Sequence, residues 1–312
     1  MKLIRNLDAS LAAVRSGAVA IGNFDGVHLG HARIVERLIA WARQVAGPAV
    51  VFTFDPHPVR LLRPAEAPPP LTWTDRKAQL LAELGIDWII AYPTDEALLS
   101  LSPREFFDSI VRERLDARAL VEGPNFYFGR GRQGTIDVLR EFASQAGIPV
   151  EVVEPLLIDS QYVSSSRVRR LVAAGEVAEA AELLTRPYRI RGMVTHGAGR
   201  GGRIGFPTAN VDAVDTLLPA PGVYAGLAHS AEGQWPAAIN IGPNPTFGEQ
   251  VLKIEAYLIG YAGSLYGQPL EIDFLRRLRE VQTFAGVDAL RTQLALDVES
   301  ALRAAVEWSG RR

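Results

Sequence analysis

Residues 22–31 read GNFDGVHLGH, a run of Gly, Asn, Asp and His placed between two apolar stretches. The apolar run Ala18–Ile21 before it predicts a buried strand, and the apolar residues after it, from Ile34 to Trp41, recur at helical spacing. The two histidines therefore lie where a strand passes into a helix. A helix start offers unpaired backbone N–H groups and the positive end of the helix dipole, so it favours an anion.

The chemistry of this stretch favours a nucleotide phosphate. His28 and His31 are three residues apart and share one face of the first helical turn. A polar surface turn and a histidine metal pair are the alternatives. The metal pair is disfavoured because no third ligand follows at a zinc-like spacing. Candidate ligand contacts in the same stretch are Gly22, Asn23, Phe24 and Asp25.

The first half of the chain alternates short apolar runs with amphipathic stretches, which predicts a parallel sheet covered by helices. The candidate strands are Ala18–Ile21, Ala49–Phe54, Trp88–Tyr92, Ala119–Glu122 and 150–153. In open sheets of this kind, ligands bind beyond the carboxyl ends of the strands. The polar motifs follow those ends.

Three further motifs belong to this half. Asp55 and His57, in TFDPHP, either face a ligand or simply end a strand. Asn125, in GPNFYFG, stands among aromatic residues that could stack on a planar heterocycle or anchor the loop to the core. Ser164 and Arg167, in SSSRVR, begin a second helix, where arginine opposes the helix dipole and so favours either an anionic ligand or a solvated face.

Near residues 182–187 the pattern changes to short runs separated by Gly, Pro and Asn, followed by a helical pattern from Val287 to Trp308. This spacing predicts an antiparallel barrel or sandwich with a terminal helix. The expected domains are therefore 1–183 and 184–312. The proline-rich segment from Arg63 to Leu71 is expected to be a surface loop.

The second half contains GAGRGG at 197–202, which matches a dinucleotide-binding pattern only in its letters. That fingerprint requires a helix to open at the glycines, whereas Gly205 and Pro207 follow at once. A flexible loop that approaches phosphates is the better interpretation, with Gly199 in it. Thr208 and Asn210 add hard oxygen atoms that suit Mg²⁺ held with a nucleotide.

Glu255 lies on a predicted strand, on the face opposite Ile254, Ala256 and Leu258. A carboxylate in such a place is usually solvated, and it becomes a candidate general base only if it reaches a substrate hydroxyl. No Walker lysine motif is present, which excludes a P-loop kinase.

Composition narrows the class. A chain of 312 residues suggests two domains, and 48% hydrophobic with 22% charged residues is typical of a globular protein. The net charge of −2 argues against a dedicated nucleic-acid binder. The absence of cysteine excludes disulfides, thiolate catalysis and cysteine zinc sites. No signal peptide and no membrane-spanning run is expected, so the cytoplasm is the expected location.

The motifs occur together in one order: GNFDGVHLGH, TFDPHP, GPNFYFG, SSSRVR, RPYRIRGMVTHG, GRIGFPTAN, GVYA, NIGPNPTFGE and EAYL. Over essentially the full chain this resembles the bifunctional bacterial riboflavin kinase/FMN adenylyltransferase family, the prokaryotic FAD synthetases. The resemblance implies an N-terminal Rossmann-like nucleotidylyltransferase domain that makes FAD and pyrophosphate from FMN and ATP. It also implies a C-terminal kinase barrel that phosphorylates riboflavin.

The resemblance further implies roles for particular residues. His28 and His31 would hold the ATP phosphates with Asn23, Ser164 and Arg167, and Asn125 would lie in the loop that contacts nucleotide and flavin. In the barrel, Thr208 and Asn210 would organise Mg²⁺ and ATP beside Gly199, Gly205 and Pro207, and Glu255 would accept the hydroxyl proton. Small departures are Ala198, where an acidic residue is common, and Ser166, where Thr is common.

Two alternatives stand beside this hypothesis. A class I aminoacyl-tRNA synthetase relative would share the histidine motif, but the KMSKS-like lysine signal is missing. A flavin- or nucleotide-binding protein that retains only one activity would show losses among the catalytic residues, all of which are present. Small molecules are the expected partners, and the sequence leaves the oligomeric state open.

Overall fold

The computed structural model describes residues 2–5, 11–197, 199–243 and 252–310. The chain forms two compact units. The first contains residues 1–68 and 73–164, and the second contains residues 69–72 and 165–312.

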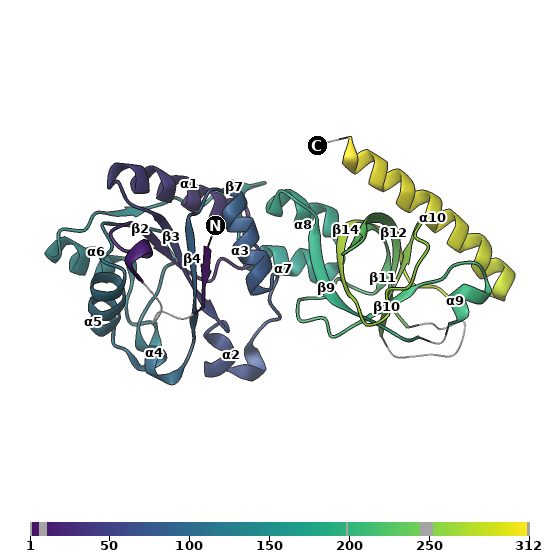
Figure 1. The fold of residues 1–312 in the computed structure, drawn as a ribbon, viewed down its shortest axis with the longest axis horizontal. Coiled ribbons are helices and arrows are strands. Elements are labelled where there is room, and N and C mark those ends of the chain that lie inside the picture. The colour runs from purple at the N-terminus through teal and green to yellow at the C-terminus, as the bar shows by residue number, and fades with distance from the viewer. Residues whose placement is uncertain (1, 6–10, 198, 244–251, 311–312) are drawn as a thin grey trace. The chain divides into compact units, whose positions relative to one another are not determined.

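The first unit is built on a six-stranded sheet in the order β1-β4-β3-β2-β5-β6 (Figure 1). Every neighbouring pair is parallel, which confirms the predicted α/β architecture. The strands are β1 (Lys2–Ile4), β2 (Ala18–Ile21), β3 (Ala49–Asp55), β4 (Trp88–Pro93), β5 (Ala119–Glu122) and β6 (Val150–Val152). The edge strand β1 was not predicted because three residues are too short for a periodic signal.

Helices cover both faces of this sheet because successive strand residues point to opposite sides. On one face, Ala20 and Val51 pack with Leu38 and Leu81, which come from α1 and α3. On the other face, strand residues pack with the α5, η3 and α6 side chains. The helical segments are η1 (Leu11–Val14), α1 (Leu29–Gln44), α2 (Val59–Leu62), η2 (Pro64–Glu66), α3 (Thr74–Glu83), α4 (Glu96–Ser100), α5 (Pro103–Phe106), the π-helical η3 (Phe107–Arg114), η4 (Arg130–Arg132) and α6 (Ile136–Gln145).

The strand order places a switch point between β2 and β5. From β2 the chain moves outward through β3 and β4, and it later returns to β5 and continues to β6 on the other side. In open parallel sheets the crevice at such a switch point, beyond the carboxyl ends of the strands, is where ligands bind. A small hairpin, β7 (Leu157–Ile158) with β8 (Gln161–Tyr162), follows the sheet.

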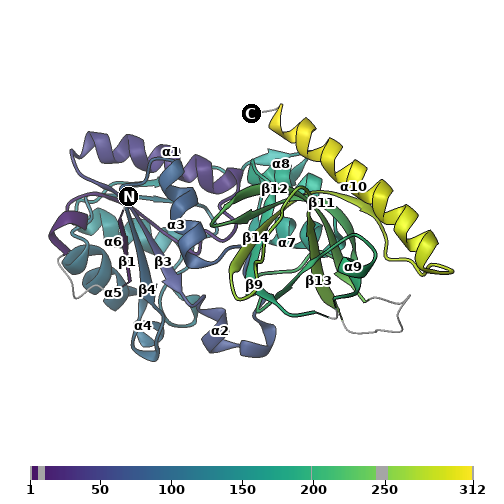
Figure 2. The ribbon, with the colours of Figure 1, turned by 45° about the vertical axis from the view of Figure 1, so that its right-hand side comes forward.

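The second unit contains a closed six-stranded barrel in the order β10-β13-β12-β11-β14-β9 (Figure 2). All of its pairs are antiparallel. A barrel is therefore present and not a sandwich. The elements of the second unit are α7 (Ser165–Ala174), α8 (Val177–Leu184), β9 (Tyr188–Thr195), α9 (Arg200–Arg203), β10 (Ala209–Asp212), β11 (Gly222–Ser230), β12 (Gly233–Gly242), β13 (Lys253–Leu258), β14 (Pro269–Arg279) and α10 (Val287–Ser309).

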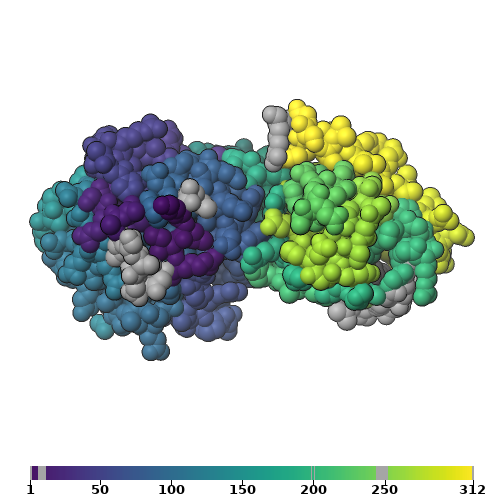
Figure 3. Space-filling model, in the orientation of Figure 1, coloured from purple at the N-terminus to yellow at the C-terminus, as the bar shows by residue number. Residues whose placement is uncertain are grey.

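The terminal helix α10, yellow in Figure 3, lies along the outside of this barrel. It packs on β11, β12 and β14. Small residues allow the close approach, since Ala301 and Ala304 contact Ala225. Within the described residues, no helix combines the length and the apolar character needed to cross a bilayer.

The second unit differs from the sequence prediction in two places. Residues 209–212 form strand β10, which was not among the expected strands, so Asn210 stands on the barrel wall. The expected flexible loop contains the single helical turn α9, which ends before Gly205. Two parts of the sequence on which the family resemblance drew, Ala198 and residues 244–249 of NIGPNPTFGE, lie outside the described residues.

Candidate active sites

The histidine motif forms the start of α1, as its sequence predicts. His28 is the N-cap residue, and its Nδ1 accepts a hydrogen bond from the backbone N–H of His31 at 3.4 Å. The two imidazole rings stack with their centroids 3.7 Å apart and their planes 17° apart. A Cβ on Gly30 would lie 3.2 Å from two atoms of the His28 ring, so this position needs a small residue. The two predicted phosphate ligands are therefore neighbours at a helix N-terminus.

The turn that leads into this helix carries backbone strain. Phe24 has a φ of 46° and Val27 a φ of 41°, in a region that residues with a side chain rarely adopt. Each such residue costs about 1–3 kcal/mol and persists only where its surroundings hold it. Both side chains are buried in the core on the α1 side of the sheet, and the Phe24 ring lies 5.0 Å from that of His31. Packing of the Phe24 and Val27 side chains in the core therefore holds the centre of the turn.

Asn23 presents an unmet hydrogen-bonding atom in the same turn. Its side-chain Oδ1 is buried and has no hydrogen-bond partner among the described residues. Its backbone carbonyl accepts a hydrogen bond from Thr53 Oγ1 at 3.2 Å. Buried polar atoms in proteins are nearly always paired, so an orphaned amide oxygen at the carboxyl edge of a sheet marks a place for a ligand group. Gly22 precedes it at the end of β2, and Asp25 is buried at 5% exposure.

Asp55 and His57 have local partners. Asp55, the last residue of β3, accepts a hydrogen bond from Thr74 Oγ1 at 2.7 Å and lies 3.6 Å from the Arg5 guanidinium. His57 Nδ1 accepts a hydrogen bond from the backbone N–H of Val59 at 3.1 Å, at the start of α2. Both side chains therefore contact residues around the end of β3. Their contacts with a ligand stay a prediction.

The loop after β5 divides its aromatic residues between core and surface. Phe128 is buried and stacks on Phe126, with ring centroids 5.5 Å apart. Tyr127 is 45% exposed and lies under the Arg132 guanidinium, 4.4 Å away. Asn125 is exposed beside them. Phe128 thus serves as an anchor, while Asn125 and Tyr127 remain accessible.

Glu122 is a buried carboxyl at the switch point that sequence reasoning did not single out. It is 3% exposed, and its Oε1 accepts a hydrogen bond of 2.7 Å from the backbone N–H of Ile21. The side chain therefore joins β2 and β5 just beyond Val19 and Leu120, where their ladder ends. Burial raises the pKa of Glu122 well above its ordinary value, and the Ile21 hydrogen bond only partly opposes this effect. The only sequence signal was a carboxylate at the end of an apolar strand.

Ser164 and Arg167 lie on either side of the division between the units. Ser164 is half-buried and belongs to the first unit. Arg167 lies in the first turn of α7, in the second unit. Their predicted contacts with ATP stay predictions.

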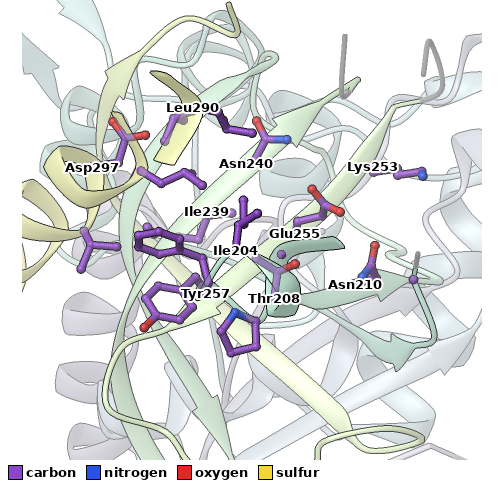
Figure 4. Close-up of a pocket in the computed structure, with 18 of the residues that line it drawn as sticks. Ile204, Thr208, Asn210, Ile239, Asn240, Lys253, Glu255, Tyr257, Leu290 and Asp297 are labelled. Carbon is purple, nitrogen blue, oxygen red and sulfur yellow. The ribbon is translucent and has the colours of Figure 1, made fainter. Parts of the chain in front are cut away.

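The second unit contains a cavity of about 350 Å³ against the outer wall of the barrel. The antiparallel register places Asn210 directly opposite Glu255, and Glu255 directly opposite Asn240. Directly opposed residues share a face and bring their Cβ atoms to about 4.5–5.5 Å. Ile254, Ala256 and Leu258 are buried on the other face of β13, as the alternation predicts. Figure 4 shows Glu255, Asn210 and Thr208 on one side of the cavity.

The glycine-rich segment forms an edge of this cavity. A Cβ on Gly197 would lie 2.1 Å from Asn210 Nδ2, so the backbone touches the amide. Gly199 caps α9 with a left-handed φ of 65°, and Gly205 follows with a φ of 91°. Gly199, Pro207 and Thr208 line the cavity.

The opposite wall comes from α10, and the ion pair that attaches this helix to the barrel was not foreseen from the sequence. Asp297 of α10 accepts hydrogen bonds from Arg279 Nε at 3.0 Å and from Arg279 Nη2 at 2.7 Å. Gln293 Nε2 donates to the same carboxylate at 3.0 Å. Asp297 is 4% exposed and Arg279 19%, so this is a nearly buried ion pair between helix and barrel. Figure 4 shows Asp297 and Leu290 across the cavity from Asn210.

The donor set around Glu255 fits a magnesium ion. Thr208 offers a hydroxyl, Asn210 an amide oxygen and Glu255 a carboxylate, which are the hard oxygen ligands that Mg²⁺ prefers. Among the described residues there is no cluster of three His, Asp or Glu side chains that could hold a metal by itself. Such a site therefore suits an ion that arrives with substrate phosphates.

Comparisons with known proteins agree with two candidate sites, one in each part of the chain. Residues 11–167 match the family model described as FAD synthetase, and residues 184–305 match that described as riboflavin kinase. The bifunctional riboflavin kinase/FMN adenylyltransferase of Pseudomonas fluorescens is 37% identical over 303 residues, 96% of this chain and 97% of the relative. The protein of the same name from Escherichia coli K12 is 34% identical over 299 residues, 95% of this chain and 96% of the relative.

A solved structure is similar to this one over nearly the full length of both chains. It is a crystal structure from Streptococcus pneumoniae described as a macrolide-efflux protein. The TM-score is 0.84 at 28% sequence identity, over 96% of this chain and 98% of that one.

Proposed function

The chain belongs to the family of bifunctional riboflavin kinase/FMN adenylyltransferases, and from this premise we propose how its residues carry out the two reactions. The protein is a transferase with both activities. It phosphorylates riboflavin to FMN and transfers the adenylyl group of ATP to FMN, giving FAD and pyrophosphate. The assignment of sites rests on one observation. Each of the two matched regions contains its own cluster of polar residues, at the start of α1 in the first region and beside the barrel cavity in the second.

The adenylyl transfer belongs to the histidine site. An oxygen of the FMN phosphate attacks the α-phosphorus of ATP, and the bond to the bridging oxygen breaks, so that pyrophosphate leaves. No general base is needed because the attacking phosphate is already ionised. His28 and His31, with the N-terminal N–H groups of α1, stabilise the charge on the phosphate oxygens. Asn23, Asn125, Ser164 and Arg167 complete the binding of ATP and FMN.

The kinase reaction belongs to the cavity of the barrel. The 5′-hydroxyl oxygen of riboflavin attacks the γ-phosphorus of ATP, ADP leaves, and Glu255 takes the hydroxyl proton. Asn210 and Asn240 lie directly opposite Glu255 on the two neighbouring strands. Thr208 and Asn210 would hold Mg²⁺, which neutralises phosphate charge when it is bound with ATP. The apolar wall from Ile239, Leu290 and Leu294 suits the flavin ring.

The functional boundary is proposed near residues 183 and 184, where the riboflavin kinase match begins. A cytoplasmic location and a partner set limited to small molecules also belong to this proposal. The motif composition and the small net charge support it.

A crossed pair of variants tests the assignment. The purified protein is incubated with riboflavin, ATP and Mg²⁺, or with FMN, ATP and Mg²⁺, and the flavins are separated by chromatography. Glu255→Gln should lower FMN formation by about 10²–10⁴-fold, because it removes a general base, yet still convert supplied FMN to FAD. His28→Ala should do the reverse.

Glu271→Gln is the matched control, a carboxylate of strand β14 that pairs with Arg189 away from the cavity. It should leave both conversions within about twofold, since surface charge substitutions have small effects. Loss of both conversions, riboflavin to FMN and supplied FMN to FAD, in either Glu255→Gln or His28→Ala would refute the assignment of two separate sites.

A further inference from the structure

Lys77 is a buried ammonium beneath the turn that carries the histidine motif. It lies on α3, is 7% exposed, and faces the core shared by α1 and α3. Its Nζ donates a hydrogen bond to Thr53 Oγ1 at 3.3 Å, and among the described residues Thr53 is its one hydrogen-bond partner. The sequence predicted no role for Lys77.

The direction of this hydrogen-bond chain is fixed by chemistry. An ammonium can only donate, so Thr53 Oγ1 accepts from Lys77. The hydroxyl proton of Thr53 then goes to the backbone carbonyl of Asn23, 3.2 Å away. Thr53 is fully buried, so water cannot replace either bond. The ammonium of α3 is thereby tied through β3 to the backbone of the phosphate-binding turn.

Charge ties the same elements together. Burial lowers the pKa of Lys77, and the carboxylates of Asp25 and Asp55 oppose this effect. Asp25 is itself in the turn and is buried, whereas Asp55 is held by Thr74 and Arg5. A buried charge is tolerated only when it is paired. The ammonium therefore has a charge partner within the turn as well as a hydrogen-bonded route to it.

The turn needs such support because it is strained at Phe24 and Val27. The buried side chains of these residues hold the turn at its centre, and the chain through Thr53 holds it at Asn23, next to β2. We propose that Lys77, acting through Thr53, is a positioning residue for adenylyl transfer, which keeps the turn of Asn23 in the conformation that binds ATP. This inference rests on the proposed function of the histidine site.

The proposal predicts a specific kinetic change. If Lys77 is replaced by Met, which fills similar space without the charge, the turn populates its binding conformation less of the time. ATP binding must then restore that conformation, so the apparent affinity for ATP falls in proportion to the competent fraction. Lys77→Met should raise the KM for ATP of FMN adenylylation about tenfold, whereas the KM for ATP of riboflavin phosphorylation should stay unchanged in the same chain.

Thr53 variants test the route. Thr53→Val keeps the shape but removes the hydroxyl, and it should raise the same KM about as much as Lys77→Met. Thr53→Ser retains the hydroxyl, so its KM for ATP should stay close to that of the unaltered protein. Lys77→Met and Thr53→Val break the same hydrogen-bond chain. The KM for ATP of the double variant should therefore be no more than about twofold above that of either single variant. Independent effects would instead raise it about a hundredfold above that of the unaltered protein.

A matched control separates positioning from stability. Leu81→Ala opens a cavity in the same face of α3 and destabilises the same core, but Leu81 is no part of the chain. Partial unfolding reduces the amount of active protein, so Leu81→Ala should lower the apparent kcat and leave the KM for ATP unchanged. If Lys77→Met and Thr53→Val behave like Leu81→Ala, or if their effects on the KM multiply in the double variant, the inference is wrong. Failure of the unaltered protein to make FAD from FMN would instead refute the adenylyl-transfer function, and this inference with it.

Discussion

Replacing Asp297 by Ala should loosen the terminal helix from the kinase barrel. The substitution leaves the Arg279 guanidinium nearly buried, with its three hydrogen bonds to the carboxylate removed. Breaking a buried pair by removing one partner costs about 3–5 kcal/mol. Because Arg279 keeps 19% of its side chain exposed and can recover some hydration, we expect the low end, about 3 kcal/mol.

That free energy predicts a measurable shift of the melting temperature. For domains of about 150–250 residues, each kcal/mol changes Tm by about 2–4 °C, so the second unit should melt about 6–12 °C lower. Calorimetry on the full chain measures this, and the transition of the second unit is identified by its upward shift when riboflavin is added. The KM for riboflavin should also rise, because α10 forms one wall of the cavity.

An exposed ion pair between the same two elements provides the control. Arg276 of β14 and Glu307 of α10 lie 3.3 Å apart, with 42% and 57% of their side chains exposed. Glu307→Ala should cost less than about 1 kcal/mol and move Tm by less than about 4 °C. Exchanging both members of the buried pair, as Arg279→Met with Asp297→Leu, should recover most of the lost stability. Equal shifts for Asp297→Ala and Glu307→Ala would refute the reasoning from burial.

Two more predictions concern one site in each unit. Gly197→Ala would place a methyl group 2.1 Å from Asn210 Nδ2 and displace the amide, so kcat/KM for riboflavin phosphorylation should fall about 10–100-fold with FMN adenylylation unchanged; Gly202→Ala, which meets nothing within 4 Å, should lose less. Glu122 has a raised pKa in the folded state, so above its ordinary pKa of about 4.3 the unfolded chain loses a proton that the folded chain retains, and stability falls as pH rises toward the folded pKa. Glu122→Gln should remove that fall. In urea unfolding between pH 5 and pH 8, the free energy of unfolding of the variant should therefore rise with pH relative to that of the unaltered protein.

Each of these has a clear contrary result. Equal losses of kinase activity in the two glycine variants would show that the contact with Asn210 is unimportant. Parallel stability curves for Glu122→Gln and the unaltered protein would show that the Glu122 carboxyl does not retain its proton on folding.

The sequence predicted most of the framework because the strands are apolar runs bounded by turn residues. β2 and β5 were predicted with the bounds that the structure has. β10 was missed, since Ala209–Asp212 is short and half polar, and only its pairing with β9 and β13 makes it a strand. The register of that pairing is what places Asn210 opposite Glu255, and no local pattern contains it.

The site residues divide in the same way. His28 and His31 were found because both lie in one short motif at a strand-to-helix junction, whose geometry is local. Lys77 and Asp297 were missed because the meaning of a charge depends on its burial and on partners that are distant in sequence, Thr53 for the first and Arg279 for the second. A lysine or an aspartate in an amphipathic helix otherwise indicates only a solvated face.

Residues 69–72 belong to the second unit although the chain on both sides of them belongs to the first. The backbone carbonyl of Pro70 accepts a hydrogen bond from Leu217, and that of Pro69 accepts one from Arg169. During synthesis this short segment leaves the ribosome well before its partners exist, so the second unit can be completed only after the first has been made.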